Sequence, residues 1–339
     1  MTNTKITYLL GAGASALALP VVADMPHRML VVLNYLKETP DYVINASAIT
    51  NDHIRGIHGQ QQGFYKDFEW LIENTKKHAS VDTFAKKLFI TKKRSDLLRL
   101  KALLTIYFIL EQQMHDADPR YDSFIASLIE PGPKMPPNVK ILTWNYDFQF
   151  EKAYSAYSEN NTLHENQREL RVTPSDFPSP STDHFSISKL NGTTSVYTTE
   201  RGGTVYQLLK DMSSKPTFNL LVELLQSYHN LKVGHDQYES MLCFAWENSH
   251  HTKFVLDEAC EDVNGTEVLV VIGYSFPFFN RLVDRRIIGS MPKLKKIYFQ
   301  APDEGADIMR NSFRSIRDFS DANIGLLRQT DKFFLPHEL

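Results

Sequence analysis

Four short groups of glycine and polar residues could bind or cleave a phosphorylated small molecule. The first group is Gly11–Ser15, with the sequence Gly-Ala-Gly-Ala-Ser, and it precedes a helical segment. Glycines in such a turn let the backbone approach a diphosphate, whose charge the amide N–H groups of a helix N-terminus can meet. The alternative is an ordinary tight turn, because the third glycine of the Gly-x-Gly-x-x-Gly pattern is missing.

An amide and a carboxylate two residues apart form the second group. Asn145 and Asp147 directly follow an apolar run. Beyond the end of a strand, these side chains could bond a ribose and a carboxamide. The alternative is an Asx turn with a cap for the helix expected within Phe148–Tyr157. The third and fourth groups, Lys189–Thr193 and Gly273–Ser275, are singly compatible with ordinary strand-to-turn transitions.

Each group follows a short run rich in Val, Ile and Leu, which predicts a strand. Continuous apolar runs separated by helical patterns are typical of a parallel sheet covered by helices on both faces. In such α/β folds the binding site lies at the carboxyl ends of the strands, where all four groups stand. We therefore expect a Rossmann-like α/β fold. The predicted strands are Ile6–Leu10, Val139–Trp144, Phe185–Leu190, Glu267–Ile272 and Lys296–Phe299.

Helical patterns fill the intervals between the predicted strands. Asp96–His115 carries a wide apolar stripe suited to a buried helix face. Residues 25–135 are mostly helical in pattern, so we expect a helical insertion or cap within a single domain that spans residues 1–339. Further helices are predicted at Phe218–Tyr228, Thr252–Val263 and Asp303–Ile316.

Composition narrows the class of protein. The net charge of −3 gives no electrostatic case for a protein that binds nucleic acid or a membrane surface. Leu9–Ala23 has the apolar character of a signal peptide, but a single lysine, Lys5, precedes it and two glycines interrupt it. Leu103–Leu110 is far shorter than the ~20 apolar residues of a membrane span. With only Cys243 and Cys260, the sequence favours a reducing compartment and a cytoplasmic protein.

In their order along the chain, the four groups resemble the motifs of the SIR2-like family. Members of this family carry Gly-Ala-Gly-x-Ser, Asn-x-Asp, His-Gly and Gly-x-Ser, each after a strand of one Rossmann-like sheet. The matching residues here are Gly11–Ser15, Asn145–Asp147, Asn191–Gly192 and Gly273–Ser275. Ser80–Phe84 and Gly273–Pro277 also resemble segments of bacterial SIR2-like defence proteins.

The resemblance implies a site for NAD, bound as a substrate, and no metal. Asn145 would contact the nicotinamide ribose or position a water, and Asp147 would bond the nicotinamide carboxamide. Leu19–Arg28 would correspond to the mobile loop over the cofactor. The residues implied to bind the cofactor are Gly11, Ala12, Gly13, Ser15, Gly192, Gly273 and Ser275.

The number of cysteines separates this chain from the sirtuin deacylases. Their zinc ribbon needs four metal-binding cysteines, and this chain has two. Bacterial relatives without the ribbon cleave NAD to nicotinamide and ADP-ribose, commonly in an antiphage response that depletes the host's NAD. The resemblance therefore implies an NAD glycohydrolase of antiphage defence. Because the SIR2-like part nearly fills the chain, we expect activation by a separate partner protein or by self-assembly into an oligomer.

Asn191 departs from the family at the position of its catalytic histidine. That histidine is the general base, and an asparagine cannot take up a proton near neutral pH. A positioned base contributes about 10²–10⁴-fold, so activity could be reduced rather than lost, with Asp147 supporting the oxocarbenium-like centre. Other interpretations are a different base, a change introduced to inactivate the protein, or a chain that only binds NAD. The candidate replacement bases are His27, His184, His53 and His58.

Two other functions compete with an NAD glycohydrolase. The first is a non-catalytic sensor subunit that binds NAD or ADP-ribose, which Asn191 favours. The second is a dehydrogenase. Two features argue against it: the third glycine of the motif is missing, and no acidic residue follows a clear second strand. The catalytic candidates of the hydrolase are Asn145, Asp147 and Asn191.

Overall fold

The computed structural model describes most of the chain as two compact units. Unit 1 contains Met1–Ala18, Ala117–Thr193 and Cys243–Leu339, and unit 2 contains Leu19–Asp116 and Thr194–Leu242. The described residues are 4–38, 52–130, 134–159, 162–175, 183–199, 203–210, 216–234, 237–247 and 249–339. The predictions of a single domain and of an insertion at residues 25–135 stay predictions.

Unit 1 is built around a parallel sheet, which has seven strands in the described part of the chain, in the order β10-β9-β8-β1-β2-β4-β3. The central strand β1 pairs with β2 on one side and with β8 on the other, and Ile6 lies opposite both Val139 and Val268. The strands are β1 (Ile6–Leu10), β2 (Val139–Thr143), β3 (Val172–Thr173), β4 (Ser186–Lys189), β8 (Val268–Ile272), β9 (Lys296–Gln300) and β10 (Ile324–Leu327).

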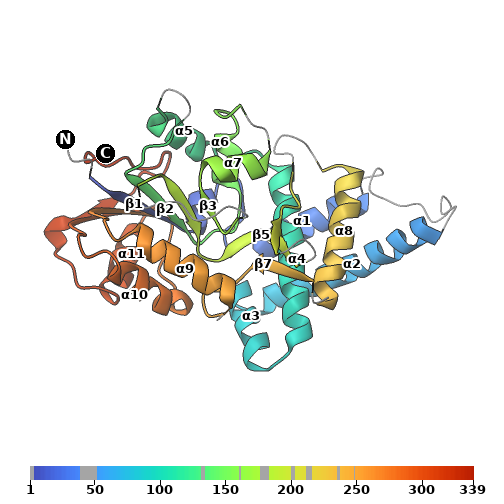
Figure 1. Ribbon diagram of the computed structural model, residues 1–339. Helices are drawn as coiled ribbons and strands as arrows, with labels where there is room; N and C mark the ends of the chain where they lie inside the picture. Colours follow the sequence, from blue (N-terminus) through green and yellow to red (C-terminus); the bar gives the residue numbers. More distant parts are fainter. Residues whose placement is uncertain are drawn as a thin grey trace. The chain divides into compact units, whose positions relative to one another are not determined.

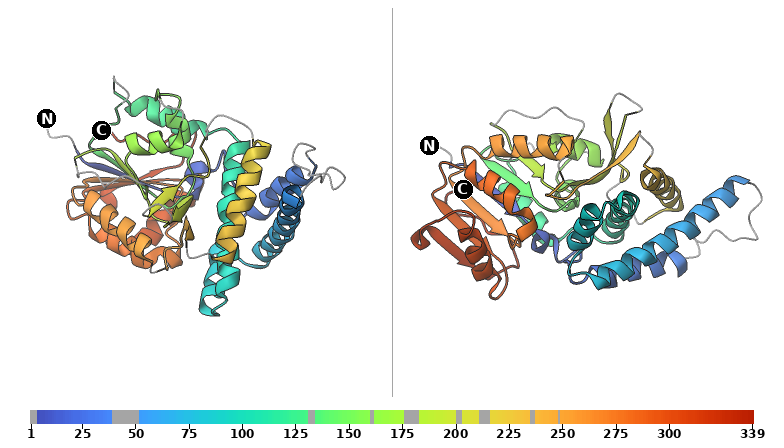
Figure 2. Two further views of the ribbon diagram at one scale, coloured as in Figure 1. Left: turned by 45° about the vertical axis from the view of Figure 1, so that its right-hand side comes forward. Right: turned by 90° about the horizontal axis from the view of Figure 1, so that it is seen from below.

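Every residue of the central strands β1, β2 and β8 is buried, and helices cover both faces of the unit 1 sheet (Figures 1 and 2). Successive side chains of a strand point to opposite faces. Tyr8 of β1 therefore packs with Phe124 and Phe150 on one face, whereas Leu9 packs with Ile287 and Phe313 on the other. One face carries α5 (Pro119–Leu128), α6 (Gln149–Tyr154) and α7 (Leu163–Glu169), and the other carries α9 (His250–Asp262), α10 (Arg281–Gly289) and α11 (Gly305–Arg314).

The winding of the chain reverses between β1 and β8. From β1 the chain runs outward through β2 to β3 and β4, and it then returns to β8 on the opposite side of β1. This arrangement is Rossmann-like, and in such sheets ligands bind outside the carboxyl ends of the strands at the reversal point. The glycine turn after β1 and Gly273 after β8 stand at this point.

Unit 2 combines helices with a small sheet of strand order β6-β5-β7. Asp67 ties three of its helices together, because its buried carboxylate bonds Arg99, Tyr228 and Lys232. No helix among the described residues is both long enough and apolar enough to span a membrane. The elements are α1 (Met25–Glu38), α2 (Asp52–Lys77), α3 (Val81–Ile90), α4 (Arg94–Met114), α8 (Phe218–Val233), β5 (Gly192–Thr198, whose first two residues belong to unit 1), β6 (Thr204–Tyr206) and β7 (Tyr238–Leu242).

The structure confirms the predicted α/β class. The five predicted strands are present, each with ends no more than one residue from the prediction, and the predicted helices correspond to α4, α8, α9, α11 and α6. The sequence did not reveal β3, β10 or the small sheet of unit 2. Helical segments occupy much of residues 25–130, and α5 at their end packs on the unit 1 sheet through Tyr121 and Phe124.

Candidate functional site

The turn after β1 packs directly on the backbone after β8. It forms a short 3₁₀ helix, η1 (Ala12–Ser15), and the N–H of Gly13 donates to the carbonyl of Gly273 at 3.1 Å. A Cβ on Gly11 would lie 2.6 Å from the Gly273 oxygen, and one on Gly13 would lie 2.7 Å from the Gly273 Cα. Gly273 itself has φ +61°, a conformation that favours glycine. These glycines are therefore required for the close approach of two strand ends.

Several amides of this turn donate to carbonyl groups of the protein. The N–H of Gly11 donates to Ile272 and that of Ala14 donates back to Gly11, in addition to the bond from Gly13. Ala12 is exposed at the start of η1. The predicted contacts of Gly11, Ala12, Gly13 and Ser15 with a diphosphate stay predictions.

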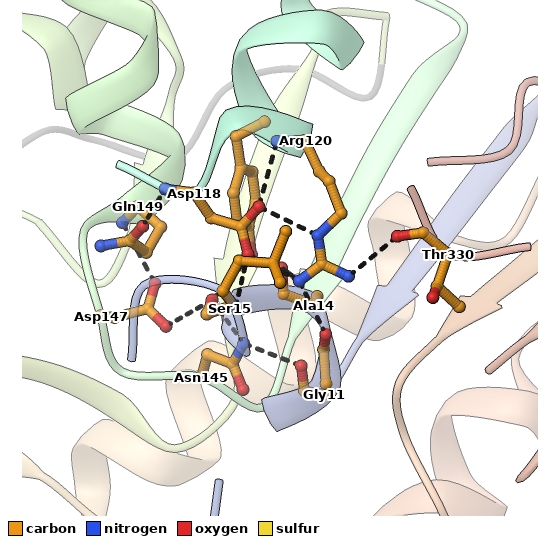
Figure 3. A network of polar contacts seen from close by, with 12 residues as sticks. Gly11, Ala14, Ser15, Asp118, Arg120, Asn145, Asp147, Gln149 and Thr330 are labelled. Atoms are coloured by element: carbon orange, nitrogen blue, oxygen red, sulfur yellow. Dashed lines mark hydrogen bonds and ion pairs between the residues drawn. The ribbon is translucent and has the colours of Figure 1, made fainter. Parts of the chain in front are cut away.

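Asn145 and Asp147 join the glycine turn in one hydrogen-bonded network (Figure 3). The Asn145 Nδ2 donates to the carbonyl of Gly11 at 2.9 Å and to Ser15 Oγ at 3.3 Å. Ser15 Oγ donates in turn to Asp147 Oδ2 at 2.9 Å. The other Asp147 oxygen accepts from the backbone N–H of Gln149 at 3.1 Å. The first two sequence groups, more than 120 residues apart in the chain, therefore meet at one edge of the sheet.

Burial raises the pKa of Asp147 to about 6. The ammonium group of Lys189 and hydrogen bonds from Gln149 and Ser15 act in the opposite direction, whereas the nearby Glu151 carboxylate adds to the rise. Asp147 is consequently a carboxylate at neutral pH and gains a proton in mild acid. A carboxylate that changes charge near neutral pH is typical of catalytic sites.

A buried ion pair that the sequence analysis missed holds the turn from α5. Arg120 binds the Asp118 carboxylate through Nε and a terminal nitrogen, at 2.9 Å and 2.6 Å, and also donates to the carbonyls of Gly13 and Ala14 at 3.1 Å (Figure 3). Asp118 caps α5 and accepts the N–H of Leu17. The pair thus satisfies carbonyl and amide groups on both sides of Ser15. The sequence does contain a signal for Asp118, because Asp followed by Pro, as in Asp118–Pro119, is typical of a helix N-terminus.

Asn191 borders the site without entering the network around Asp147. Its Nδ2 donates to the carbonyl of Trp144, the residue before Asn145, at 2.9 Å. Its Oδ1 is buried and has no hydrogen-bond partner among the described residues. Gly192 follows with φ +72°, which explains glycine at this position.

The Gly273–Ser275 group reaches the site through Tyr274 rather than through its serine. The Tyr274 ring stacks on Trp144 with centroids 5.6 Å apart, and its hydroxyl donates to both oxygens of Asp284 at 3.0 Å. Burial raises the pKa of Asp284 to about 7. Ser275 is exposed beyond the end of β8, so its predicted contact with the cofactor stays a prediction.

Of the candidate replacement bases, His184 belongs to unit 1, the unit that contains Asp147. His184 precedes β4 and therefore lies at the amino end of a strand whose carboxyl end faces the site, where its carbonyl accepts from Lys140. His27 on α1 and His58 on α2 belong to unit 2, and the side chain of His53 lies outside the described residues. In the predicted cofactor loop, the part from Met25 onward forms the start of α1.

Two cavities in unit 1 are lined by none of the residues that bond Asp147. One of 480 Å³ is lined by Gln300 and by residues 326–329 and 331–335, and one of 530 Å³ is lined by residues of α9 and α10, among them Cys260. In the part of the chain that the structure describes, no three His, Cys, Asp or Glu side chains gather in a group that could hold a metal.

No model of a known protein family and no curated protein matches this chain. Similar solved structures include a Sir2 homologue in complex with NAD, with 13% identity, a TM-score of 0.39, and coverage of 92% of this chain and 89% of that one. A mutant Sir2 homologue with ADP-ribose has 13% identity, a TM-score of 0.38, and coverage of 92% and 91%. Sir2 bound to an acetylated peptide has 12% identity, a TM-score of 0.37, and 92% of both chains covered.

Proposed function

We propose that this chain is a SIR2-like protein that binds NAD at the carboxyl edge of the unit 1 sheet and hydrolyses it to nicotinamide and ADP-ribose. The observation that carries the proposal is the single network in which Gly11, Ser15, Asn145 and Asp147 meet. It stands at the reversal point of the sheet, where α/β folds bind ligands. The order of the four sequence motifs supports NAD as the ligand.

The proposed reaction breaks the bond between the nicotinamide nitrogen and ribose C1′. The bonding electrons leave with nicotinamide, which becomes neutral, so the leaving group needs no proton. Positive charge then develops on the ribose, where the Asp147 carboxylate would stabilise it. Water bonds to C1′ and gives up a proton, which a carboxylate with a pKa of about 6 can accept near neutral pH. Asn145, half-buried beside Asp147, would position the ribose or this water.

Incubating the purified protein with NAD and following free nicotinamide by chromatography tests the proposal. Release of nicotinamide identifies a hydrolase. Binding of NAD without release identifies a sensor, and reduction of NAD with added substrates identifies a dehydrogenase.

Asn191 favours one second function, a subunit that binds NAD or ADP-ribose without cleaving it. Its side chain donates to Trp144 and offers no group that takes up a proton near neutral pH. Restoring the family residue by Asn191→His should increase nicotinamide release, because a positioned base contributes about 10²–10⁴-fold. Unchanged or lower release from a correctly folded variant would show that position 191 does not correspond to the family histidine.

The biological role that we propose is antiphage defence by depletion of the host's NAD. Its support is the sequence resemblance of Ser80–Phe84 and Gly273–Pro277 to bacterial defence proteins. A toxic activity of this kind must be controlled, so we propose that a partner protein or self-assembly activates the chain.

A further inference from the structure

A buried ion pair lies directly behind Asp147. Lys189 is the last residue of β4, is only 1% exposed, and bonds Glu151 Oε1 of α6 at 2.5 Å. The same ammonium group donates to the backbone carbonyl of Asp147 at 2.5 Å and lies 4.6 Å from the centre of the Phe148 ring. Gln167 Nε2 supports Glu151 from α7 at 3.2 Å.

Three buried charged side chains therefore occupy a small volume, two of them negative. Ionised groups removed from water are costly unless an opposite charge compensates them. Lys189 is the cation that bonds both Glu151 and the Asp147 backbone. From α5, the Tyr121 hydroxyl lies close to this site: it bonds Ser15 Oγ at 3.1 Å, and burial followed by the Asp147 carboxylate raises its pKa.

We propose that Lys189 and Glu151 form a positioning pair that keeps Asp147 ionised and fixes its backbone. Lys189 supplies the positive charge that stabilises the carboxylate, and Glu151 limits that effect while it holds Lys189 in place. The importance of the pair for catalysis rests on the proposed function, whereas its effect on the charge of Asp147 does not.

The geometry predicts opposite effects for the two members of the pair. Lys189 lowers the pKa of Asp147 and Glu151 raises it by a smaller amount. Removing Glu151 alone should therefore lower that pKa, whereas removing both should raise it. A pair too far from the Asp147 carboxylate to act on its charge would produce no such reversal of sign.

The test uses Glu151→Gln and the double variant Lys189→Met/Glu151→Gln. The double variant avoids leaving Glu151 buried without its partner, which is strongly destabilising. The matched control is Lys140→Met/Asp262→Asn, which removes a second lysine–carboxylate pair (3.6 Å), with Lys140 buried and Asp262 half-buried, at the opposite end of β2 and β4. Selective ¹³C labelling of aspartate, assigned with Asp147→Asn, gives the Asp147 pKa by NMR titration. The pH profile of nicotinamide release gives a second, independent measurement of the Asp147 pKa.

We expect Glu151→Gln to lower the Asp147 pKa and the double variant to raise it by about one pH unit, as removal of a neighbouring charge does. The control variant should leave the Asp147 pKa unchanged. In the other two variants, the acid limb of the pH profile of nicotinamide release should shift together with the Asp147 pKa. If both variants keep their fold, shifts of the Asp147 pKa in the same direction, or no shift in either, would overturn the proposal. If the wild-type protein releases no nicotinamide, the proposed function fails, and the NMR titration still decides the role of the pair.

Discussion

At the scale of single residues, Asp147 combines burial with a negative charge. A carboxylate can accept about four hydrogen bonds, and Ser15 and Gln149 each donate one to Asp147. A buried carboxylate with a raised pKa is less favourable for folding than its neutral form.

The variant Asp147→Asn separates the contribution of Asp147 to catalysis from its effect on the stability of the fold. We expect nicotinamide release to fall by at least about 100-fold, because an electrostatic group facing the transition state contributes that much. Thermal stability at pH 8 should be equal or higher, since the amide can still accept a hydrogen bond and carries no buried charge. Chromatographic assays and thermal unfolding measure the two effects. Asp122→Asn, on the exposed side of α5, is the control, and full activity of Asp147→Asn would contradict the assignment.

Nicotinamide release should decline as the pH falls through about 6, where Asp147 gains a proton. The direction follows from the need for the charged form, which predominates only above its pKa. Initial rates between pH 5 and pH 8, at a saturating NAD concentration, measure the effect. A rate that stays constant down to about pH 5 would show that the carboxylate of Asp147 is not the required group.

At the scale of elements, the site depends on the close approach of the turn after β1 to the end of β8. Gly13→Ala would place a methyl group against the Gly273 backbone, so we expect a loss of about 1–3 kcal/mol in the free energy of unfolding. Gly59→Ala in α2 is the control, because no atom of the described residues lies within 4 Å of its added Cβ and alanine favours a helix by about 1 kcal/mol. Urea unfolding should show opposite signs for the two variants. Equal effects of the two variants on the free energy of unfolding would mean that a methyl group at position 13 does not disturb the packing on Gly273.

The same elements show how far the sequence could predict this structure. Strands such as β1 and β8 were recognisable because nearly all their residues are apolar, as burial on both faces requires. By contrast, β3 has two residues and β10 contains Gly325, so neither carries a clear strand pattern. The network around Asn145 and Asp147 was predictable in outline because both follow a strand. Lys189 and Glu151 were not, because nothing in their spacing shows that a lysine and a glutamate are buried together.

At the scale of the whole molecule, Asp284 links stability to pH. Its pKa is about 7 in the folded protein against 3.8 for an ordinary aspartate, so the folded state holds a proton more tightly than the unfolded state. This contribution to stability is present below about pH 4 and is lost as the pH rises to about 7. Asp284→Asn should therefore be more stable than wild type at pH 8, by on the order of a few kcal/mol, and should differ little at pH 4. Urea unfolding across this pH range measures it, with the exposed Asp257→Asn as control.

The mass of the native protein tests the expected dependence of activity on assembly. If a partner or self-assembly activates the chain, the isolated monomer should release little nicotinamide, and the rate per chain should rise with protein concentration or with the partner. Light scattering coupled to the nicotinamide assay measures both quantities. A monomer that hydrolyses NAD at full rate would contradict this expectation.

The packing of Gly11 and Gly13 on Gly273 also constrains how the sequence can diverge. Because any side chain at one position would strike the backbone at another, a change at one of the three is tolerated only with a shift of the neighbouring strand end. Distant relatives should therefore keep this trio together even where overall identity has decayed, so that a search weighted on the three positions and on their separation would recognise them.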